Sequence, residues 1–279
     1  MSTHSSWIEK IRNLPVLPQV AMRVTERMQS PTATLAEISD LIKSDPGLST
    51  RVLKLANSSY YSIPGGVSDV SKALQFLGFN TIAQIVLTSS VIGSFRNPGI
   101  PEFPLAPFWL HSFAVGQLAE IAARSLQLKS PSEAFVGGLL HDVGKLILLE
   151  VAPEQLQKTV RIAREKKISF VAAETESGAP SHVLLGVELA RHWRLPDPIR
   201  LSIENHHASP ANREWAVIEW ANLHSHARHT GASGSHEIHP ESGLDRAQQR
   251  LGLSAAARES IEIQFDKEFE KAGAILNGH

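Results

Sequence analysis

The stretch Gly137-Gly-Leu-Leu-His141-Asp142-Val-Gly-Lys145-Leu-Ile-Leu-Leu149 places three polar groups inside an apolar pattern. Its leucine, valine and isoleucine residues recur at helical spacing and predict a helix that packs in a core. The glycine pair at its start allows another helix to pack closely. Lys145 follows His141 by four residues and Asp142 by three, and residues at these separations are neighbours on a helix. The stretch therefore predicts an imidazole, a carboxylate and an ammonium held close together.

These three groups point to metal and phosphate chemistry. A neutral imidazole and a carboxylate together bind borderline divalent metals, and an ammonium suits a phosphate oxygen. The His-Asp dipeptide alone is also typical of a hydrogen-bonded core histidine beside a surface charge. Further ligands are therefore needed before a metal site is favoured.

Other histidines fall where helices are expected to pack. One lies in the first turns of a helix over 108–126, one opens a helix over 181–192, and two adjacent ones end a helix over 198–206. Each has apolar neighbours. A buried histidine needs a polar partner, and a shared metal would supply one, as in di-metal helix bundles. The predicted metal ligands are His111, His141, Asp142, His182, His206 and His207.

The remaining histidine runs are left out of this site. His224, His226 and His229 are typical of a polar helix end, and no carboxylate accompanies them at ligand spacing. His236 and His239 lie in the polar stretch 229–246, which we expect to be a mobile loop without rigid support for a metal.

Apolar spacing and capping residues predict helices along the rest of the chain. Thr34 with Glu37 and Ser130 with Glu133 are predicted capping boxes, and Asp45 followed by a proline marks another helix start. No strand pattern with a hairpin turn competes, so the expected fold class is all-α. We expect helices over 19–28, 35–42, 46–57, 70–77 (stopped by Gly78), 81–95, 108–126, 131–151, 154–166, 170–176, 181–192, 198–206, 211–229 and 254–272.

One segment divides this helical pattern. Asn97–Pro104 holds three prolines and a glycine, which interrupt helices. We therefore expect two packed helical subdomains, the first over residues 1–97 and the second over residues 98–230. The second contains every predicted ligand. Residues 231–279 are expected to form a mobile loop and a C-terminal helix.

Composition excludes several classes of function. The 279 residues are 42% hydrophobic and contain no cysteine, which excludes disulfides, iron–sulfur clusters and a cysteine nucleophile. Lys and Arg number 27 against 28 Asp and Glu, and this neutrality gives no strong nucleic-acid signal. We find no apolar run long enough to span a bilayer and no signal-peptide core, so we expect a cytoplasmic protein without a membrane partner.

The sequence resembles the HDOD domain of bacterial signalling proteins over about residues 10–228. That family is a helical, usually regulatory relative of the HD superfamily of metal-dependent phosphohydrolases, so the resemblance implies that the second subdomain is HD-like. The matching stretches are Leu14-Pro-Val-Leu-Pro18, Ile38–Leu48, Arg51–Asn57, Ala73–Gly78, Trp109-Leu-His111-Ser, Gly138–Lys145, Gly186–Ala190, Trp193–Pro196 and Asn205-His-His207.

Similarity to the HD-GYP cyclic-dinucleotide phosphodiesterases carries over to individual residues. All six predicted ligands fall on metal-ligand positions of that family, and Lys145 falls on its phosphate-contacting lysine. Two positions depart from the pattern. Asn222 stands at about the place of the last metal-ligand aspartate, and Ala208-Ser-Pro-Ala replaces the Gly-Tyr-Pro segment. The first change removes a negative charge from one metal position, and the second removes a feature of the dinucleotide enzymes.

Two functions fit this pattern. The first is a signal-transduction module with a metal-binding His/Asp cluster, a protein partner and weak or absent catalysis. The second is an active metal-dependent phosphohydrolase or phosphodiesterase, with Lys145 and Asp142 as catalytic groups and a nucleotide or cyclic dinucleotide as ligand. The resemblance implies one or two divalent transition ions, with iron as first candidate and manganese, nickel or zinc as alternatives.

Overall fold

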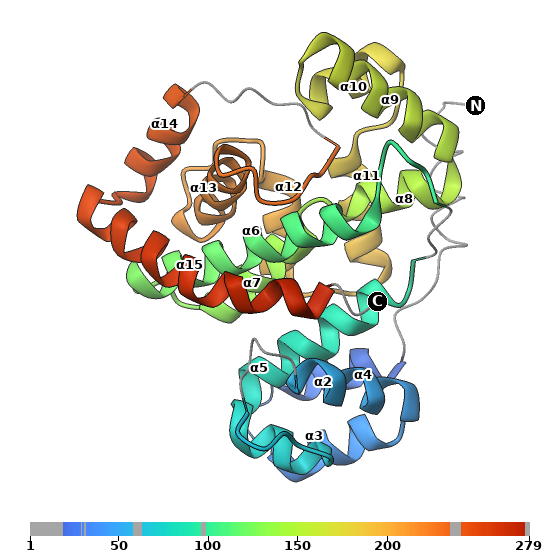
Figure 1. The fold of residues 1–279 in the computed structure, drawn as a ribbon, viewed down its shortest axis with the longest axis vertical. Coiled ribbons are helices and arrows are strands. Elements are labelled where there is room, and N and C mark those ends of the chain that lie inside the picture. The colour runs from blue at the N-terminus through green and yellow to red at the C-terminus, as the bar shows by residue number, and fades with distance from the viewer. Residues whose placement is uncertain are drawn as a thin grey trace. The chain divides into compact units, whose positions relative to one another are not determined.

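The computed structural model describes residues 19–28, 30, 32–57, 63–95, 99–234 and 241–276. Over these residues the chain forms fourteen helices and no strand (Figure 1), which confirms the predicted all-α class. None of these helices combines the length and hydropathy that a membrane span requires. The predicted loop histidines His236 and His239 lie outside the described residues.

The helices group into two compact units that divide between Phe95 and Arg96 and again within the last helix, after Phe265. One unit holds α2 (Gln19–Met28), α3 (Leu35–Lys43), α4 (Pro46–Ala56) and α5 (Val70–Ile92). The other holds α6 (Leu105–Ser125), α7 (Pro131–Leu140), α8 (Val143–Val151), α9 (Pro153–Lys166), α10 (Phe170–Ser177), α11 (His182–His192), α12 (Asp197–Asn205), α13 (Arg213–Ala227), α14 (Glu241–Leu251) and the first part of α15 (Ala255–Leu276).

Local signals set the helix boundaries of the α2–α5 unit. The capping box predicted for Thr34 and Glu37 is present, with the Thr34 amide donating to the Glu37 carboxylate over 2.9 Å. Asp45 caps α4, because its Oδ1 accepts from the Leu48 amide at 2.9 Å. The stop predicted at Gly78 is confirmed as a break inside α5, where this residue has φ 77°.

The helix predicted over 131–151 is two helices, with His141 and Asp142 at the junction. The Nδ1 of His141 donates to the Gly138 carbonyl over 2.6 Å, and Asp142 leaves helical geometry with φ −99° and ψ 9°. Ser130 makes no side-chain capping bond, so the second predicted capping box is wrong. The break places both polar residues where two helices meet.

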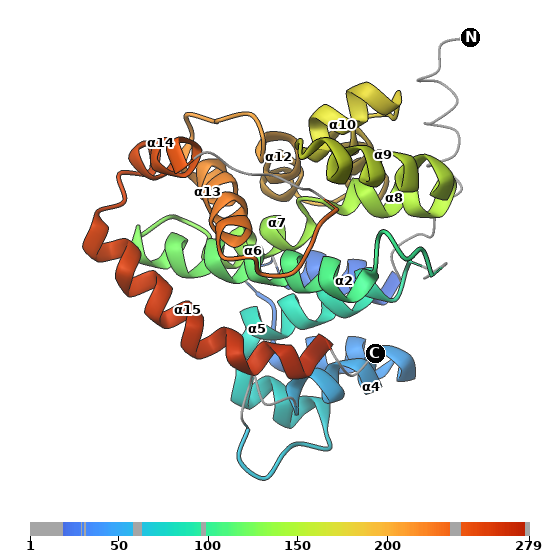
Figure 2. The same cartoon turned by 45° about the horizontal axis from the view of Figure 1, so that its top comes forward.

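The prediction of a mobile loop over 229–246 is also wrong at its C-terminal end, because α14 begins at Glu241. Ala247 and Leu251, four residues apart, are fully buried on one face of this otherwise polar helix. Figure 2 shows α14 beside α13, on which it packs. So few apolar residues in a polar stretch gave too weak a helical pattern to predict.

Packing between helices brings distant parts of the chain to the junction. Helix α6 packs on α7 and α13, while α11 packs on α8 and α12. A Cβ on Gly138 would lie 2.7 Å from the Cα of Gly116 in α6, and a Cβ on Gly144 would lie 1.8 Å from the carbonyl oxygen of His182. Only glycine fits at such approaches, so the close helix packing expected beside His141 is confirmed.

Gly144→Ala should lower the free energy of unfolding by about 3 kcal/mol, because the added methyl group forces α8 away from the start of α11. Gly243→Ala in α14 is the matched control, since nothing lies within 4 Å of a Cβ there. Alanine inside that helix should raise stability by about 0.5–1 kcal/mol. Denaturant unfolding followed by circular dichroism measures both effects, and equal stability of the two variants would contradict the packing of α8 on α11.

Candidate metal centre

The structure brings the six predicted ligands into two groups that share Asp142. The first, here called the His111 group, consists of His111, His141 and Asp142. The second, the His182 group, consists of Asp142, His182, His206 and His207. Within each group, one ligand atom of every residue lies within 4.8 Å of the others. The ligands come from α6, the α7–α8 junction, the start of α11 and the end of α12.

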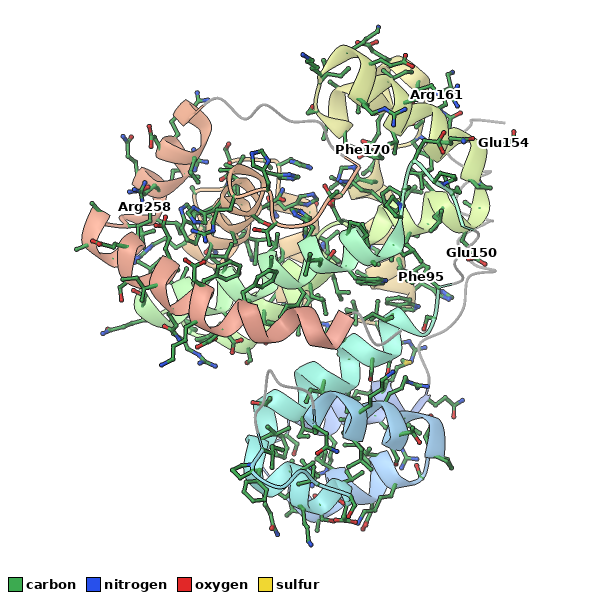
Figure 3. The ribbon with its side chains drawn as sticks, in the orientation of Figure 1. Phe95, Glu150, Glu154, Arg161, Phe170 and Arg258 are labelled. Carbon is green, nitrogen blue, oxygen red and sulfur yellow. The ribbon has the colours of Figure 1, made fainter. Side chains whose placement is uncertain are left out.

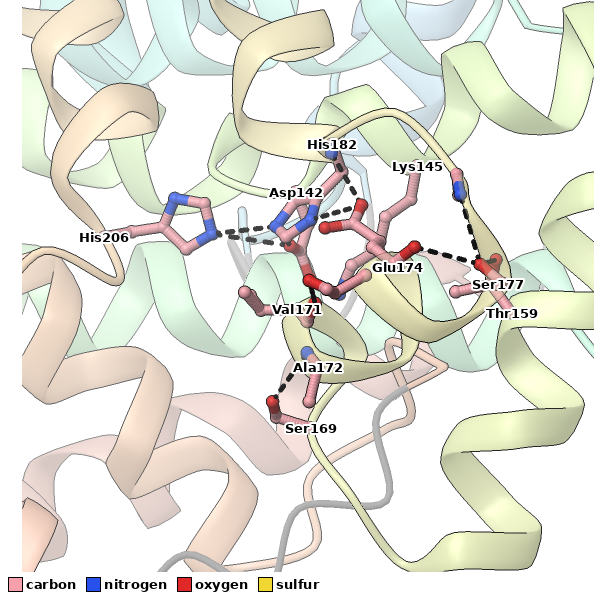
Figure 4. Close-up of polar contacts among 12 residues, drawn as sticks. Asp142, Lys145, Thr159, Ser169, Val171, Ala172, Glu174, Ser177, His182 and His206 are labelled. Atoms are coloured by element: carbon pink, nitrogen blue, oxygen red, sulfur yellow. Dashed lines mark hydrogen bonds and ion pairs between the residues drawn. The ribbon is translucent and has the colours of Figure 1, made fainter.

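In the His182 group, two imidazoles converge on one carboxylate oxygen (Figure 4). Asp142 Oδ1 lies 3.3 Å from His182 Nε2 and 3.6 Å from His206 Nε2. The two Nε2 atoms lie 3.3 Å apart. These three residues are buried, whereas His207 is exposed and its ring centroid lies 4.0 Å from that of His206. This group therefore reaches the protein surface through His207.

Hydrogen bonds fix which ring nitrogen carries the proton. The Nδ1 of His206 donates to the Ile203 carbonyl over 2.7 Å, and the Nδ1 of His182 donates to the Glu174 carboxylate over 2.9 Å. A neutral imidazole protonated at Nδ1 has a lone pair at Nε2. When both rings are neutral, their Nε2 lone pairs face each other and the carboxylate, and a cation between them relieves this repulsion.

Asp142 Oδ1 and His141 Nε2 are among the buried polar side-chain atoms of the described residues that make no well-formed hydrogen bond. Leaving buried acceptors unsatisfied is costly. His141 also donates through Nδ1 to Gly138, and its Nε2 lies 3.2 Å from Asp142 Oδ2. Imidazole nitrogens with one carboxylate are the donor set of borderline transition ions. The residues present therefore fit a divalent transition metal.

Without a metal, a proton takes part of this role. Burial opposes protonation of His182, but hydrogen bonds to Asp142 and Glu174 outweigh it and raise its pKa. Burial lowers the pKa of His206 to about 4, so this ring stays neutral and can accept from His182. A metal ion at this position competes with that proton.

Asp142 is the charged centre of both groups. Burial alone would raise its pKa, but Lys145 and His141 hold it well below the usual range, so the carboxylate is ionised. Lys145 Nζ lies 2.7 Å from Asp142 Oδ2. The ammonium is buried and lies 4.5 Å from the ring centroid of Phe170, which is marked in Figure 3. The predicted proximity of Lys145 and Asp142 is therefore present, and it commits the lysine to one carboxylate oxygen.

The His111 group meets a neutral amide where the resemblance places an aspartate. His111 Nε2 lies 3.1 Å from Asn222 Oδ1, and its Nδ1 lies 3.2 Å from Ser225 Oγ. Burial, with the nearby His141, lowers the pKa of His111 to about 3. Both ring nitrogens of this neutral histidine already have protein partners.

Sequence reasoning missed two neighbours of the centre. Glu174 in α10 is buried and accepts from both the amide and Nδ1 of His182, the amide at 2.6 Å. A carboxylate among the apolar residues of α10 was the available signal, but its separation from His182 matches no helical spacing. His226, set aside as part of a polar run, has its ring centroid 4.5 Å from that of His111. His224 of the same run stacks on Trp220.

This helical fold and its paired His/Asp groups define a protein of the HDOD class. The model of the HDOD domain family matches residues 14–209, and the chain belongs to this family. The resemblance identified from the sequence is thereby confirmed.

Solved structures share the fold. An HDOD domain protein of unknown function from Geobacter sulfurreducens is 25% identical, with 98% of each chain covered and a TM-score of 0.78. A candidate phosphohydrolase from Shewanella amazonensis SB2B is 23% identical, with 97% of each chain covered and a TM-score of 0.75. A candidate signal transduction protein from Marinobacter aquaeolei VT8 is 24% identical over 95% of this chain and 59% of its own, with a TM-score of 0.73.

A curated relative is longer than this chain. An uncharacterized protein from Treponema pallidum (strain Nichols) is 26% identical over 207 residues, which are 74% of this chain. The match covers 40% of that protein, so the chain spans about two fifths of the relative's length.

The metal-free protein should lose stability as the pH falls from 6.5 to 4. Unfolded histidines bind a proton below about pH 6.5. Folded His111 and His206 do not, because their pKa values are lowered to about 3 and about 4. Each of these two histidines should therefore lower the free energy of unfolding by about 1.4 kcal/mol for every pH unit of acidification. The raised pKa of His182 acts above pH 6.5 and leaves this window unchanged.

Denaturant unfolding in the presence of a chelator measures this slope. His224→Gln provides a comparison outside both groups, since burial lowers the pKa of His224 to about 4. In that variant the free energy of unfolding should fall less steeply with pH, because the contribution of His224 is missing. A stability that stays constant between pH 6.5 and 4 would show that these histidines are not buried in their neutral form.

Proposed function

We propose that this HDOD chain is a metal-binding regulatory module of bacterial signal transduction with weak or absent catalysis. The observation that carries the proposal is the divided role of Asp142. One of its oxygens faces the Nε2 atoms of His182 and His206, while the other pairs with buried Lys145. The first contact favours metal binding. The second keeps the Lys145 ammonium, the group that would contact a phosphate, paired with Asp142 and away from a substrate.

The proposed metal is a divalent transition ion held by the six predicted ligands or a part of them. Imidazole-rich sites with one carboxylate favour iron, manganese, nickel or zinc over calcium and magnesium, which prefer oxygen ligands. Iron is the first candidate, from the likeness to the HD superfamily. Catalysis is not needed for such an ion to stabilise the junction of α7 and α8.

The regulatory part of the proposal rests on the unit formed by α2–α5. None of the described residues of that unit belongs to either ligand group, although the family match extends across it. Its task is therefore separate from holding the metal, and we propose that it serves a protein partner in a cytoplasmic signalling pathway. The solved relative from Marinobacter aquaeolei VT8, a candidate signal transduction protein, is consistent with this role.

A phosphohydrolase is the second candidate function. Lys145 beside Asp142 favours it, because an ammonium at a His/Asp centre can neutralise phosphoryl oxygens. A divalent ion would supply Lewis acidity for phosphoryl transfer. Asp142 and His182 would hold that ion, and a nucleotide or cyclic dinucleotide would be the substrate. For this reaction Lys145 has to leave both Asp142 and the Phe170 ring, which is why the module is preferred.

Protein purified without an affinity tag should contain at least half an equivalent of a transition metal, measured by inductively coupled plasma mass spectrometry. The His141→Ala, His206→Ala double variant should lose it, because a nitrogen donor disappears from each group. His192→Ala, at a half-buried histidine outside both groups, is the matched control and should keep the metal. Folded wild-type protein that neither contains nor takes up a metal would contradict the proposal.

Metal-loaded wild-type protein and Asp142→Ala should hydrolyse nucleotide phosphomonoesters and cyclic dinucleotides at the same background rate. The expected reason is that Lys145 is committed to Asp142 and buried. Phosphate release and product chromatography measure turnover. A wild-type rate at least a hundredfold above that of the variant would favour the phosphohydrolase and exclude the module without catalysis.

A further inference from the structure

We infer that the chain holds a single metal ion, in the His182 group, and that Asn222 leaves the His111 group without one. The inference rests on the proposed metal binding and specifies its place and number. It follows from a difference in charge, hydrogen bonding and exposure between the two groups.

The two oxygens of Asp142 have different surroundings. Oδ1 faces His182 Nε2 at 3.3 Å and His206 Nε2 at 3.6 Å, and it makes no well-formed hydrogen bond among the described residues. Oδ2, which lies 3.2 Å from His141 Nε2 in the His111 group, already pairs with the Lys145 ammonium at 2.7 Å. The ammonium beside Oδ2 repels a dication, whereas Oδ1 faces imidazole nitrogens whose proton a metal can displace. The shared carboxylate therefore serves the His182 group better.

A second carboxylate supports the same group. Glu174 accepts from His182 Nδ1 at 2.9 Å and from the His182 amide at 2.6 Å. A carboxylate behind a metal-ligating histidine orients the ring and makes its Nε2 more basic. His111 Nδ1 instead lies 3.2 Å from the neutral Ser225 hydroxyl. The His182 group therefore has a second carboxylate, Glu174, next to its ligands, whereas the His111 group has only the shared Asp142.

Asn222 occupies the remaining position of the His111 group. Its Oδ1 lies 3.1 Å from His111 Nε2, so the amide contacts the nitrogen that a metal would need. An amide oxygen is neutral and binds a transition ion more weakly than a carboxylate does. An ion here would have to replace the His111–Asn222 contact without gaining a charge in return. Replacing Asn222 by aspartate would supply that charge.

The solvent exposure of the ligands also favours the His182 group. All three residues of the His111 group are buried, whereas His207 is exposed in the His182 group. One ligand of the His182 group is therefore accessible from the protein surface. The His111 group has no exposed ligand.

Titration of metal-free protein with Zn²⁺, followed by isothermal calorimetry, tests the number of sites. Wild-type protein should bind one equivalent and Asn222→Asp should bind two. Asn212→Asp is the matched control, because Asn212 caps α13 by accepting from Glu214 and aspartate caps equally well. The control should bind one equivalent. Two equivalents in the wild type, or one in a folded Asn222→Asp, would overturn the inference.

A second set of variants tests the place of the ion and does not depend on Asn222→Asp folding. His182→Gln should weaken Zn²⁺ binding at least tenfold, and Glu174→Gln should weaken it about 10- to 100-fold. His111→Gln should leave the affinity within about twofold of the wild type. Loss of the single site in His111→Gln with its retention in His182→Gln would overturn the inference while metal binding itself stands. No Zn²⁺ binding by folded wild-type protein would overturn the proposed metal-binding function as well.

Discussion

The buried carboxylate of Asp142 is the charge on which the second unit is organised. An ionised group in a protein interior requires nearby partners of opposite charge or hydrogen-bond donors. Lys145 supplies one, and the histidines around the carboxylate supply the remaining polar surroundings. Helices α6, α11 and α12 and the α7–α8 junction have to meet at this point. The glycine contacts between α6 and α7 and between α8 and α11 make that meeting possible, because a side chain would hold the backbones apart.

The imidazoles around Asp142 are oriented by hydrogen bonds from their Nδ1 atoms, on the side of the ring away from the carboxylate. The Nδ1 atoms of His141 and His206 donate hydrogen bonds to the backbone carbonyls of Gly138 and Ile203, and the Nδ1 of His182 donates to Glu174. Two of these acceptors lie three residues before their histidine, so the last turn of a helix positions the ring. The Nε2 atoms are thereby directed at the carboxylate before any ion arrives, which reduces the cost of ordering ligands on metal binding.

The two groups around Asp142 are alike in residue type and different in electrostatics. Glu174 and the Asp142 Oδ1 that faces two imidazoles favour a cation on one side, while Lys145 and Asn222 disfavour it on the other. Under the proposed function, the framework keeps its histidines without catalysing phosphoryl transfer. In the proposed function, a metal held in this way would stabilise the α7–α8 junction and the start of α11.

The sequence by itself determined the helical class, most helix positions and six polar residues that the fold brings together. These features rest on local signals, such as the Thr34–Glu37 capping box and apolar residues at helical spacing, or on histidines with apolar neighbours. Only the tertiary structure decided that the helix breaks at His141 and that α14 packs on α13 through Ala247 and Leu251. It also decided that Glu174 and Asn222 face different histidines. These are contacts between residues on different helices, and their energies depend on packing and charge that no spacing along the chain encodes.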